Sequence, residues 1–251
     1  NVWCAAGKGT FGTEELVRRI EVVGLRRLVR HRRLIVPQLG APGISAHEVQ
    51  RATRFRVHFG PVRASDIPGY VRAGLEATPQ MRRVRFSVLD RLVLVPMELV
   101  PASKAVLVFA VVMTVLFGLG PDGFKLGRAW SAGVPVAGLG LVALISGAVV
   151  TPLLLPVIPG RAFAWKGALV GVLLTAAYVA VVPPFNGGGR ALAMFAYAFT
   201  PAASSYLALQ FTGSTPFTGM SGVRMELRSS LPVHIAGFAI AIALLVVHRV
   251  T

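Results

Sequence analysis

The sequence predicts two successive parts, a partial α/β domain of the Rossmann-like class and an all-α transmembrane domain of about five helices. Three observations predict this division. The 251 residues are 54% hydrophobic and only 14% charged, which is too apolar for an ordinary soluble domain. Residues 1–100 contain 17 of the 26 Lys and Arg and 8 of the 10 Asp and Glu, so the charge is concentrated early. Short helix-like and strand-like stretches alternate before residue 90, whereas long apolar runs follow residue 103.

Three helices are predicted in the first part. Thr13 begins the first, because its side chain can cap free N–H groups and two acids follow it at the positive end of the helix dipole. The second extends from Ser45 to about Thr53, since Ser45 and Glu48 have the spacing of a capping box. The third covers residues 66–74. The apolar stripe of the first helix consists of Leu16, Ile20, Val23 and Leu28.

Three short stretches have the pattern of strands. Residues 33–36 are an apolar run that Pro37 ends, residues 54–59 alternate at period two, and residues 81–86 are a further candidate. Alternation with helices indicates an α/β sheet. Ligands on such sheets gather at the loops beyond the carboxyl ends of the strands. Here those loops have the sequences QLGAPG (38–43) and GPVRASD (60–66).

The predicted domain boundaries are 1–90 for the α/β part, 91–102 for a Pro-bounded amphipathic connector at the membrane surface, and 103–251 for the membrane part. A spanning helix needs about 20 mostly apolar residues. Prolines should bend the second span, and Pro201 should kink the fourth, which neighbouring helices in a bundle can tolerate. The predicted spans are 103–120, 132–156, 164–183, 191–211 and 231–248.

Charged residues in the membrane part favour an anchor over a pump. Asp122 and Glu226 are predicted to lie in loops, so no acid is expected within a span, whereas cation-coupled transporters usually keep one there. His234 is interpreted as a satisfied residue near the start of the last span. The Arg-rich stretch before the first span predicts that residues 1–100 face the cytoplasm.

The formal net charge of +16 does not predict nucleic-acid binding. Basic flanks commonly accompany membrane segments, because anionic lipids attract them. The sequence also has no helix-turn-helix, zinc-finger or RRM-like pattern. The single Cys excludes an internal disulfide and fits a reducing compartment.

The segment around Cys4 is the candidate site. Its AAGKGT string is not a P-loop, because that motif needs a Gly where Val2 stands and a Ser or Thr where Gly9 stands. One Cys cannot form a zinc site. A catalytic dyad would require a distant partner among His31, His47 and His58, and nothing marks one of them. Spacing alone favours Cys4 as a small buried hydrophobic residue.

The exact string NVWCAAGKGTFGT (1–13) nevertheless resembles the signature of the membrane corrinoid proteins of mercury methylation, the mercury methylation protein A family. The resemblance continues through HRRLIVPQLGAPG, GPVRASDIP, Arg91-Leu-Val-Leu and FTGSTPFTGMSGVRMEL (211–227), where Gly219-Met220 departs from the expected polarity. Residues 1–75 are also similar to the corrinoid domain in the large subunit of the corrinoid iron–sulfur protein. In the family the motif is internal, so the resemblance implies an N-terminally truncated fragment.

The resemblance implies that the motif forms a cap helix under a corrinoid (cobalamin-type) cofactor, with Cys4 as catalytic residue and lower axial ligand of the cobalt. A thiolate is a soft, strongly donating ligand. Asn1 and Lys8 could hydrogen-bond the amide groups of the ring, Trp3 could pack near it, and the small residues could let the backbone approach it. The implied cofactor-binding residues are Asn1, Val2, Trp3, Cys4, Ala5, Ala6, Gly7, Lys8, Gly9 and Thr10. The His-supplying corrinoid motif D-x-H-x-x-G is absent.

The function implied is methyl transfer from a methyl-cobalt(III) corrinoid to inorganic Hg(II), which makes methylmercury. The implied partners are a ferredoxin-like protein with 4Fe–4S clusters, a folate-type methyl donor or its methyltransferase, Hg(II) itself and the lipid bilayer. The implied location is the cytoplasmic (inner) membrane, multi-pass, with the corrinoid domain facing the cytoplasm. The alternatives are a membrane-anchored corrinoid methyl carrier of one-carbon and acetyl-CoA metabolism, and a transporter with a small regulatory domain.

Overall fold

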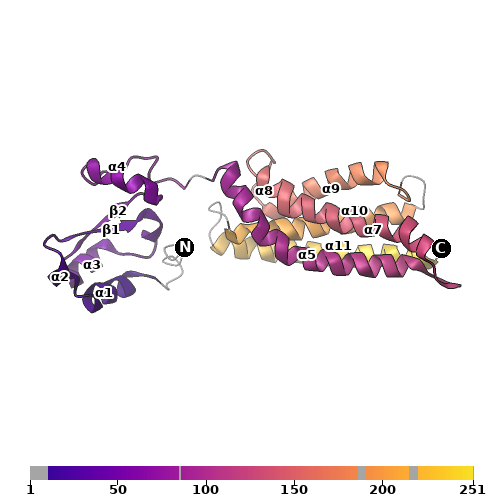
Figure 1. Cartoon of the computed structure of the whole chain (residues 1–251), viewed down its shortest axis with the longest axis horizontal. Helices are drawn as coiled ribbons and strands as arrows, with labels where there is room; N and C mark the ends of the chain where they lie inside the picture. Colours follow the sequence, from indigo (N-terminus) through magenta and orange to yellow (C-terminus); the bar gives the residue numbers. More distant parts are fainter. Residues whose placement is uncertain (1–10, 85, 186–189, 215–219, 251) are drawn as a thin grey trace. The chain divides into compact units, whose positions relative to one another are not determined.

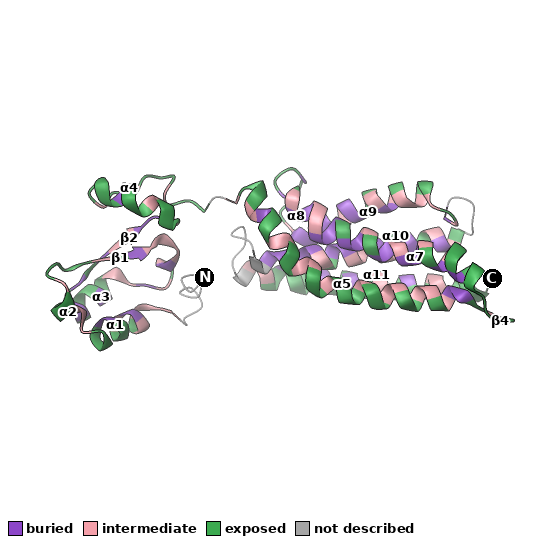
Figure 2. Ribbon diagram, in the orientation of Figure 1, coloured by how far each residue is buried: buried purple, intermediate pink, exposed green. Residues whose placement is uncertain are grey.

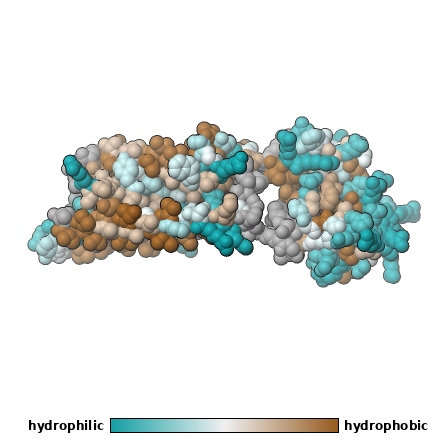
Figure 3. Space-filling view, turned by 180° about the vertical axis from the view of Figure 1, so that it is seen from behind, coloured by the Kyte–Doolittle hydropathy of each residue, from teal (hydrophilic) through white to brown (hydrophobic). Residues whose placement is uncertain are grey.

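The structure is a computed structural model that describes residues 11–84, 86–185, 190–214 and 220–250. The chain divides into two compact units, Asn1–Arg85 and Phe86–Thr251. Figure 3 shows mainly hydrophilic residues over the first unit and large hydrophobic areas over the helices of the second. Each unit has its own apolar core, so the two are described separately.

The first unit is a small α/β arrangement around two parallel strands, β1 (Arg33–Pro37) and β2 (Arg56–Gly60) (Figure 1). Helices α1 (Thr13–Val22) and α3 (Ala46–Thr53) contact each other, and α3 also contacts β2. Two of the three predicted strands, 33–36 and 54–59, are therefore confirmed, as are all three predicted helices, the third of which covers Ile67–Arg72. The remaining elements are α2 (Leu25–Leu28), η2 (Gln38–Gly40), η3 (Ala64–Asp66) and α4 (Ile67–Arg72).

The core of this unit follows from the sequence periodicity. Leu16 and Ile20 lie one turn apart on α1, and Val49 lies on α3; all three are buried together with Val36 of β1 and Phe55. Positions spaced by three or four residues share one face of a helix. The predicted stripe extends less far than expected, because Val23 and Leu28 are 56% and 67% exposed.

The third predicted strand is wrong. Residues 81–83 form turns and bends, and no strand is present at the described positions of 81–86. The backbone N–H groups of Met81 and Arg83 donate to the nearby carbonyls of Thr78 and Gln80. A backbone hydrogen bond from Val62 N–H to Met81 O links this stretch to the region after β2. With two parallel strands described, the structure shows a small α/β unit and not a complete Rossmann-like sheet.

In the second unit, the described residues form a bundle with five helices long and apolar enough to cross a membrane. This finding confirms the predicted number of spans and indicates a multi-pass membrane protein. The helical elements of the bundle are α5 (Val88–Gly118), α6 (Leu126–Arg128), η4 (Ala129–Gly133), α7 (Val134–Leu144), η5 (Ile145–Val150), α8 (Thr151–Leu153), α9 (Phe163–Val181), α10 (Arg190–Gln210), η6 (Phe211–Ser214) and α11 (Met220–Val250). A short ladder of β3 (Leu119–Gly120) and β4 (Gly123–Phe124) follows α5.

Helix α10 is central, with α7, α9 and α11 around it, while α5 packs mainly on α7. In the apolar windows of α5 and α11, only 11% of residues are buried inside the protein, against 44% for α10. Figure 2 accordingly shows mostly exposed and intermediate residues along α5. The outer faces of α5 and α11 are therefore the surfaces that meet lipid.

Helix α5 is longer than the predicted first span. Ser87 and Asp90 form a capping box that begins it, with Ser87 Oγ accepting from Asp90 N–H and the Asp90 carboxylate accepting from Ser87 N–H. Residues 91–102, predicted as a separate connector, belong to this continuous helix, which contains Pro96 and Pro101. The short S-x-x-D signature was the local signal for this start.

Two π-helical segments accompany the prolines of the second span. Segment η4 ends just before Val134-Pro135, and η5 ends just before Thr151-Pro152. Proline lacks an N–H donor and its ring collides with the carbonyl four residues earlier. A widened turn relieves this collision, so the helix continues through both prolines.

Candidate functional site

All ten residues of the predicted cofactor-binding motif, Asn1–Thr10, lie outside the described residues. The roles of Cys4 and its neighbours therefore stay predictions. What the structure places is the chain immediately after the motif, where Gly12 precedes α1. The contacts at Gly12 and Thr13 show which edge of the α/β unit the start of α1 adjoins.

Thr13 joins the start of α1 to the loop that follows β1. Its backbone N–H donates to Gly43 O at 3.1 Å, and its Oγ1 accepts from the backbone N–H of Ser45 at 2.8 Å. The contact is close, since a Cβ on Gly12 would stand 3.2 Å from Gly43 O. We call these contacts of Thr13 with Gly43 and Ser45 the Thr13 clamp.

The Thr13 clamp lies at the carboxyl edge of the two strands. Strand β1 pairs with β2 in parallel, from Arg33 opposite Arg56 to Pro37 opposite Gly60. The loops 38–43 and 60–66 consequently leave the sheet at the same edge. Ligands of parallel α/β sheets bind beyond this edge. Thr13, three residues after the motif, is therefore held where a ligand of such a sheet is expected.

A polar pocket of about 260 Å³ adjoins the loop after β2. Its charged lining includes Arg63 and Asp66 from that loop and Arg83 from the turn region. Such a lining can both donate and accept hydrogen bonds. The full lining is Arg63, Ser65, Asp66, Thr78, Gln80, Met81 and Arg83.

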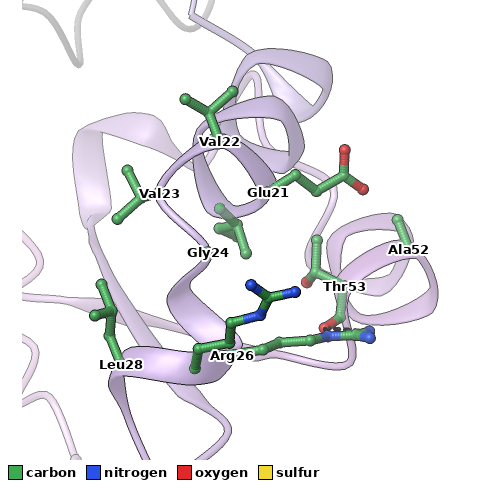
Figure 4. Close-up of a pocket in the computed structure, with 10 residues that line it drawn as sticks. Glu21, Val22, Val23, Gly24, Arg26, Leu28, Ala52 and Thr53 are labelled. Atoms are coloured by element: carbon green, nitrogen blue, oxygen red, sulfur yellow. Dashed lines mark hydrogen bonds between the residues drawn. The ribbon is translucent and has the colours of Figure 1, made fainter.

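A larger pocket of about 590 Å³ lies at the opposite end of α1 (Figure 4). It is bordered by the last turn of α1, by Gly24 and α2, and by the end of α3. The Arg26 guanidinium donates two hydrogen bonds to Thr53 O, at 2.8 and 2.9 Å, and so caps the C-terminus of α3. Since α1 rises about 15 Å over its ten residues, this pocket is remote from the Thr13 clamp.

The three His residues considered as partners of Cys4 occupy different places. His47 on α3 contacts Arg51, and the ring of His31 accepts from Arg33 N–H in an exposed turn. His58 lies on β2, and its buried Nε2 has no hydrogen-bond partner within the described chain. Within the described residues, no three His, Cys, Asp or Glu side chains form a group that could hold a metal ion.

The membrane unit contains a buried polar cluster that the sequence did not predict. Glu226 was expected in a loop, but it lies on α11, is 9% exposed and accepts a 2.7 Å hydrogen bond from Ala164 N–H. The expectation of no acid in a spanning helix is therefore wrong. Lys166 is also buried, and its Nζ donates to Leu155 O.

His234 and Ser205 extend this cluster. Ser205 Oγ lies 2.8 Å from His234 Nε2 and donates to Ala164 O at 2.8 Å. With its own proton directed to Ala164, Ser205 must accept from Nε2–H. His234 Nδ1 is buried without a partner among the described residues, so this His is only half satisfied, contrary to prediction.

Comparisons with known proteins add no relative: no protein-family model, no curated protein and no solved structure matches this chain.

Proposed function

We propose that this chain is a membrane-anchored, corrinoid-dependent methyltransferase that methylates inorganic Hg(II). The order of residues in NVWCAAGKGT supports this function. The structural observation that carries the proposal is the Thr13 clamp, which holds the third residue after the motif at the carboxyl edge of a parallel strand pair. The five apolar helices support the membrane anchor.

Two features of the described residues support a corrinoid at this edge. The loop 38–43 contains Gly40, Ala41 and Gly43, so no bulky side chain projects from these three positions. The neighbouring polar pocket offers donors and acceptors that suit the amide groups around a corrin ring. When bound, the corrinoid would supply a cobalt-bound methyl group that can be transferred as a nucleophile.

In this proposal Cys4 would hold the corrinoid cobalt through its thiolate, which suits a soft metal centre and would make the cobalt more electron-rich. Asn1 and Lys8 would bind the amide groups of the ring, and the Thr13 clamp holds the chain that follows the motif. A ferredoxin-like partner provides electrons, because a single Cys cannot ligate an iron–sulfur cluster.

The test is mercury methylation by the full-length protein and its Cys4→Ala variant, reconstituted with corrinoid, methyl donor and reductant. We expect Cys4→Ala to abolish methylmercury formation while the protein remains membrane-inserted. A matched control is Glu14→Gln, an exposed position one residue beyond Thr13. Full activity of Cys4→Ala would refute the proposal, and corrinoid binding without mercury methylation would favour the methyl-carrier alternative.

A further inference from the structure

An apolar groove of about 250 Å³ runs along the outside of the bundle between α5 and α11. Helices α7 and α10 form its floor, where Gly140, Ala143 and Ala203 have small side chains. Its surface is almost entirely apolar. It is bordered by α5 and, at Phe238, by α11, the two helices with the smallest share of buried residues. The full lining is Ala102, Ala105, Val106, Phe109, Gly140, Ala143, Phe199, Ala203, Tyr206, Leu207 and Phe238.

A row of three aromatic rings closes one end of the groove. Phe109 of α5 stacks on Phe199 of α10 with ring centroids 4.4 Å apart, and Phe199 meets Phe238 of α11 at 6.0 Å. Helices α5 and α11 run in the same direction and α10 runs against them (Figure 1). The lining residues Ala102 and Tyr206 therefore lie on the side of this row toward the starts of α5 and α11.

Two arginines stand at that open side. Arg224 and Arg228 are exposed on the first turns of α11 and line a second pocket of about 460 Å³ with Met225 and Ser229. Viewed down the axis of α11, Arg224 lies about 40° from Phe238 and Arg228 about 80° from it, because successive residues of a helix are rotated by about 100°. Within the described chain, no carboxylate forms a salt bridge with either guanidinium.

The spacing from Arg228 to the aromatic row is close to the hydrocarbon depth of one lipid leaflet, and Arg224 lies one helical turn further out. Arg228 and Phe238 are ten residues apart, which is about 15 Å along a helix. Half of a hydrocarbon core of about 30 Å is also about 15 Å. A headgroup held at Arg224 and Arg228 would thus extend its chain to the closed end of the groove.

We infer that this groove binds one acyl chain of an anionic phospholipid, whose phosphate is held by Arg224 and Arg228. Guanidinium groups bind phosphate oxygens in paired, charge-assisted hydrogen bonds. The groove is smaller than pockets that enclose whole ligands, so it suits a single chain. A helix of a second copy is about 10 Å wide, so only roughly 3 Å of its length would fit within 250 Å³.

Native mass spectrometry of the full chain in detergent, with added phosphatidylglycerol or phosphatidylcholine, tests the inference. Wild type should retain one phosphatidylglycerol. Ala105→Trp fills the groove, and excluding even two methylene groups should weaken retention about tenfold. Ala239→Trp, exposed beside Phe238 but outside the lining, should retain lipid like wild type. Arg224→Gln with Arg228→Gln should lower phosphatidylglycerol retention to the level of phosphatidylcholine.

Equal retention by Ala105→Trp and Ala239→Trp would overturn the assigned chain site. Equal wild-type binding of both lipids would overturn the role of the arginines. Conversion of a dimer to a monomer by Ala105→Trp without lipid loss would assign the groove to a second copy instead. Ala102→Phe, at a half-buried lining position, serves as a second filling variant if Ala105→Trp does not elute as folded protein.

Discussion

Glu226 and Ala164, 62 residues apart in sequence, are joined by a 2.7 Å hydrogen bond from the Ala164 N–H to the Glu226 carboxylate. Ala164 is the second residue of α9, whose N-cap residue Ala162 has no capping side chain. The first N–H groups of a helix lack intrahelical acceptors and carry partial positive charge. Glu226 of α11 therefore caps α9, and this assigns the buried acid a structural role.

Removing this cap should destabilise the bundle. A buried donor left without its acceptor costs about 1–3 kcal/mol, so we expect Glu226→Ala to lower the free energy of unfolding by that amount. Glu226→Gln retains an acceptor oxygen, so its free energy of unfolding should fall by about half as much. Reversible unfolding in mixed micelles measures the free energy of unfolding of both variants. Equal losses for the two variants would contradict the capping role.

Ser205 should be energetically coupled to Glu226. Ser205 Oγ donates to Ala164 O, while Glu226 accepts from the N–H of the same residue. Changes to groups that share a partner are not additive and typically show coupling of about 0.5–3 kcal/mol. A double-mutant cycle of Ser205→Ala, Glu226→Ala and the double variant measures this coupling energy. A coupling energy of zero would show that the two contacts act independently.

The glycines of α9 should resist enlargement. A Cβ on Gly167 would stand 2.5 Å from Ala208 Cβ and 2.7 Å from Ser204 O, so α9 and α10 touch backbone to backbone. Gly171 lies four residues later on the same face, in the small-xxx-small pattern of closely packed membrane helices. Gly167→Ala should therefore destabilise the bundle by about 1–3 kcal/mol.

Gly127 provides the matched control for Gly167. A Cβ there would meet nothing within 4 Å, and its φ is not in the left-handed range. Alanine is favoured over glycine in a helix by up to about 1 kcal/mol, so Gly127→Ala should be neutral or stabilising in the same unfolding measurement. A comparable loss of stability in Gly127→Ala and Gly167→Ala would contradict close helix packing as the cause of the destabilisation.

Acid should weaken the start of α1. Hydrogen bonds from Arg19 and then Arg18 hold the pKa of Glu15 below its ordinary value of 4.5. A carboxyl whose pKa is lower in the folded state stabilises it above the unfolded pKa, and this contribution disappears as the pH falls through the folded pKa. NMR titration of Glu15 in the full chain should show this lowered pKa, whereas an ordinary or raised value would contradict the pairing. Glu15→Gln should remove the corresponding pH dependence.

Local signals predicted the local structure well. Ser45 and Glu48 predicted the start of α3, where Ser45 Oγ accepts from Glu48 N–H. The runs 33–36 and 54–59 predicted β1 and β2. The stretch 81–86 failed because alternation alone does not supply a neighbouring strand to pair with.

Partners distant in sequence were beyond prediction. Glu226 was assigned to a loop because the predicted last span begins only at residue 231, and its hydrogen bond with Ala164 joins residues 62 positions apart. The Thr13 clamp likewise depends on residues 30 and 32 positions away. The G-x-x-x-G spacing of Gly167 and Gly171 was a readable signal for the close contact of α9 with α10. Cys4 lies outside the described residues, so its role stays a prediction from the motif.

The cobalt spectrum of the purified full-length protein tests the central claim most directly. We expect tightly bound corrinoid whose absorption and paramagnetic resonance spectra show a thiolate ligand in wild type. Cys4→Ala should remove that signature, and Cys4→His should replace it with a nitrogen-ligand signature. Absence of corrinoid from the wild-type protein, or identical cobalt spectra in wild type and Cys4→Ala, would contradict the account.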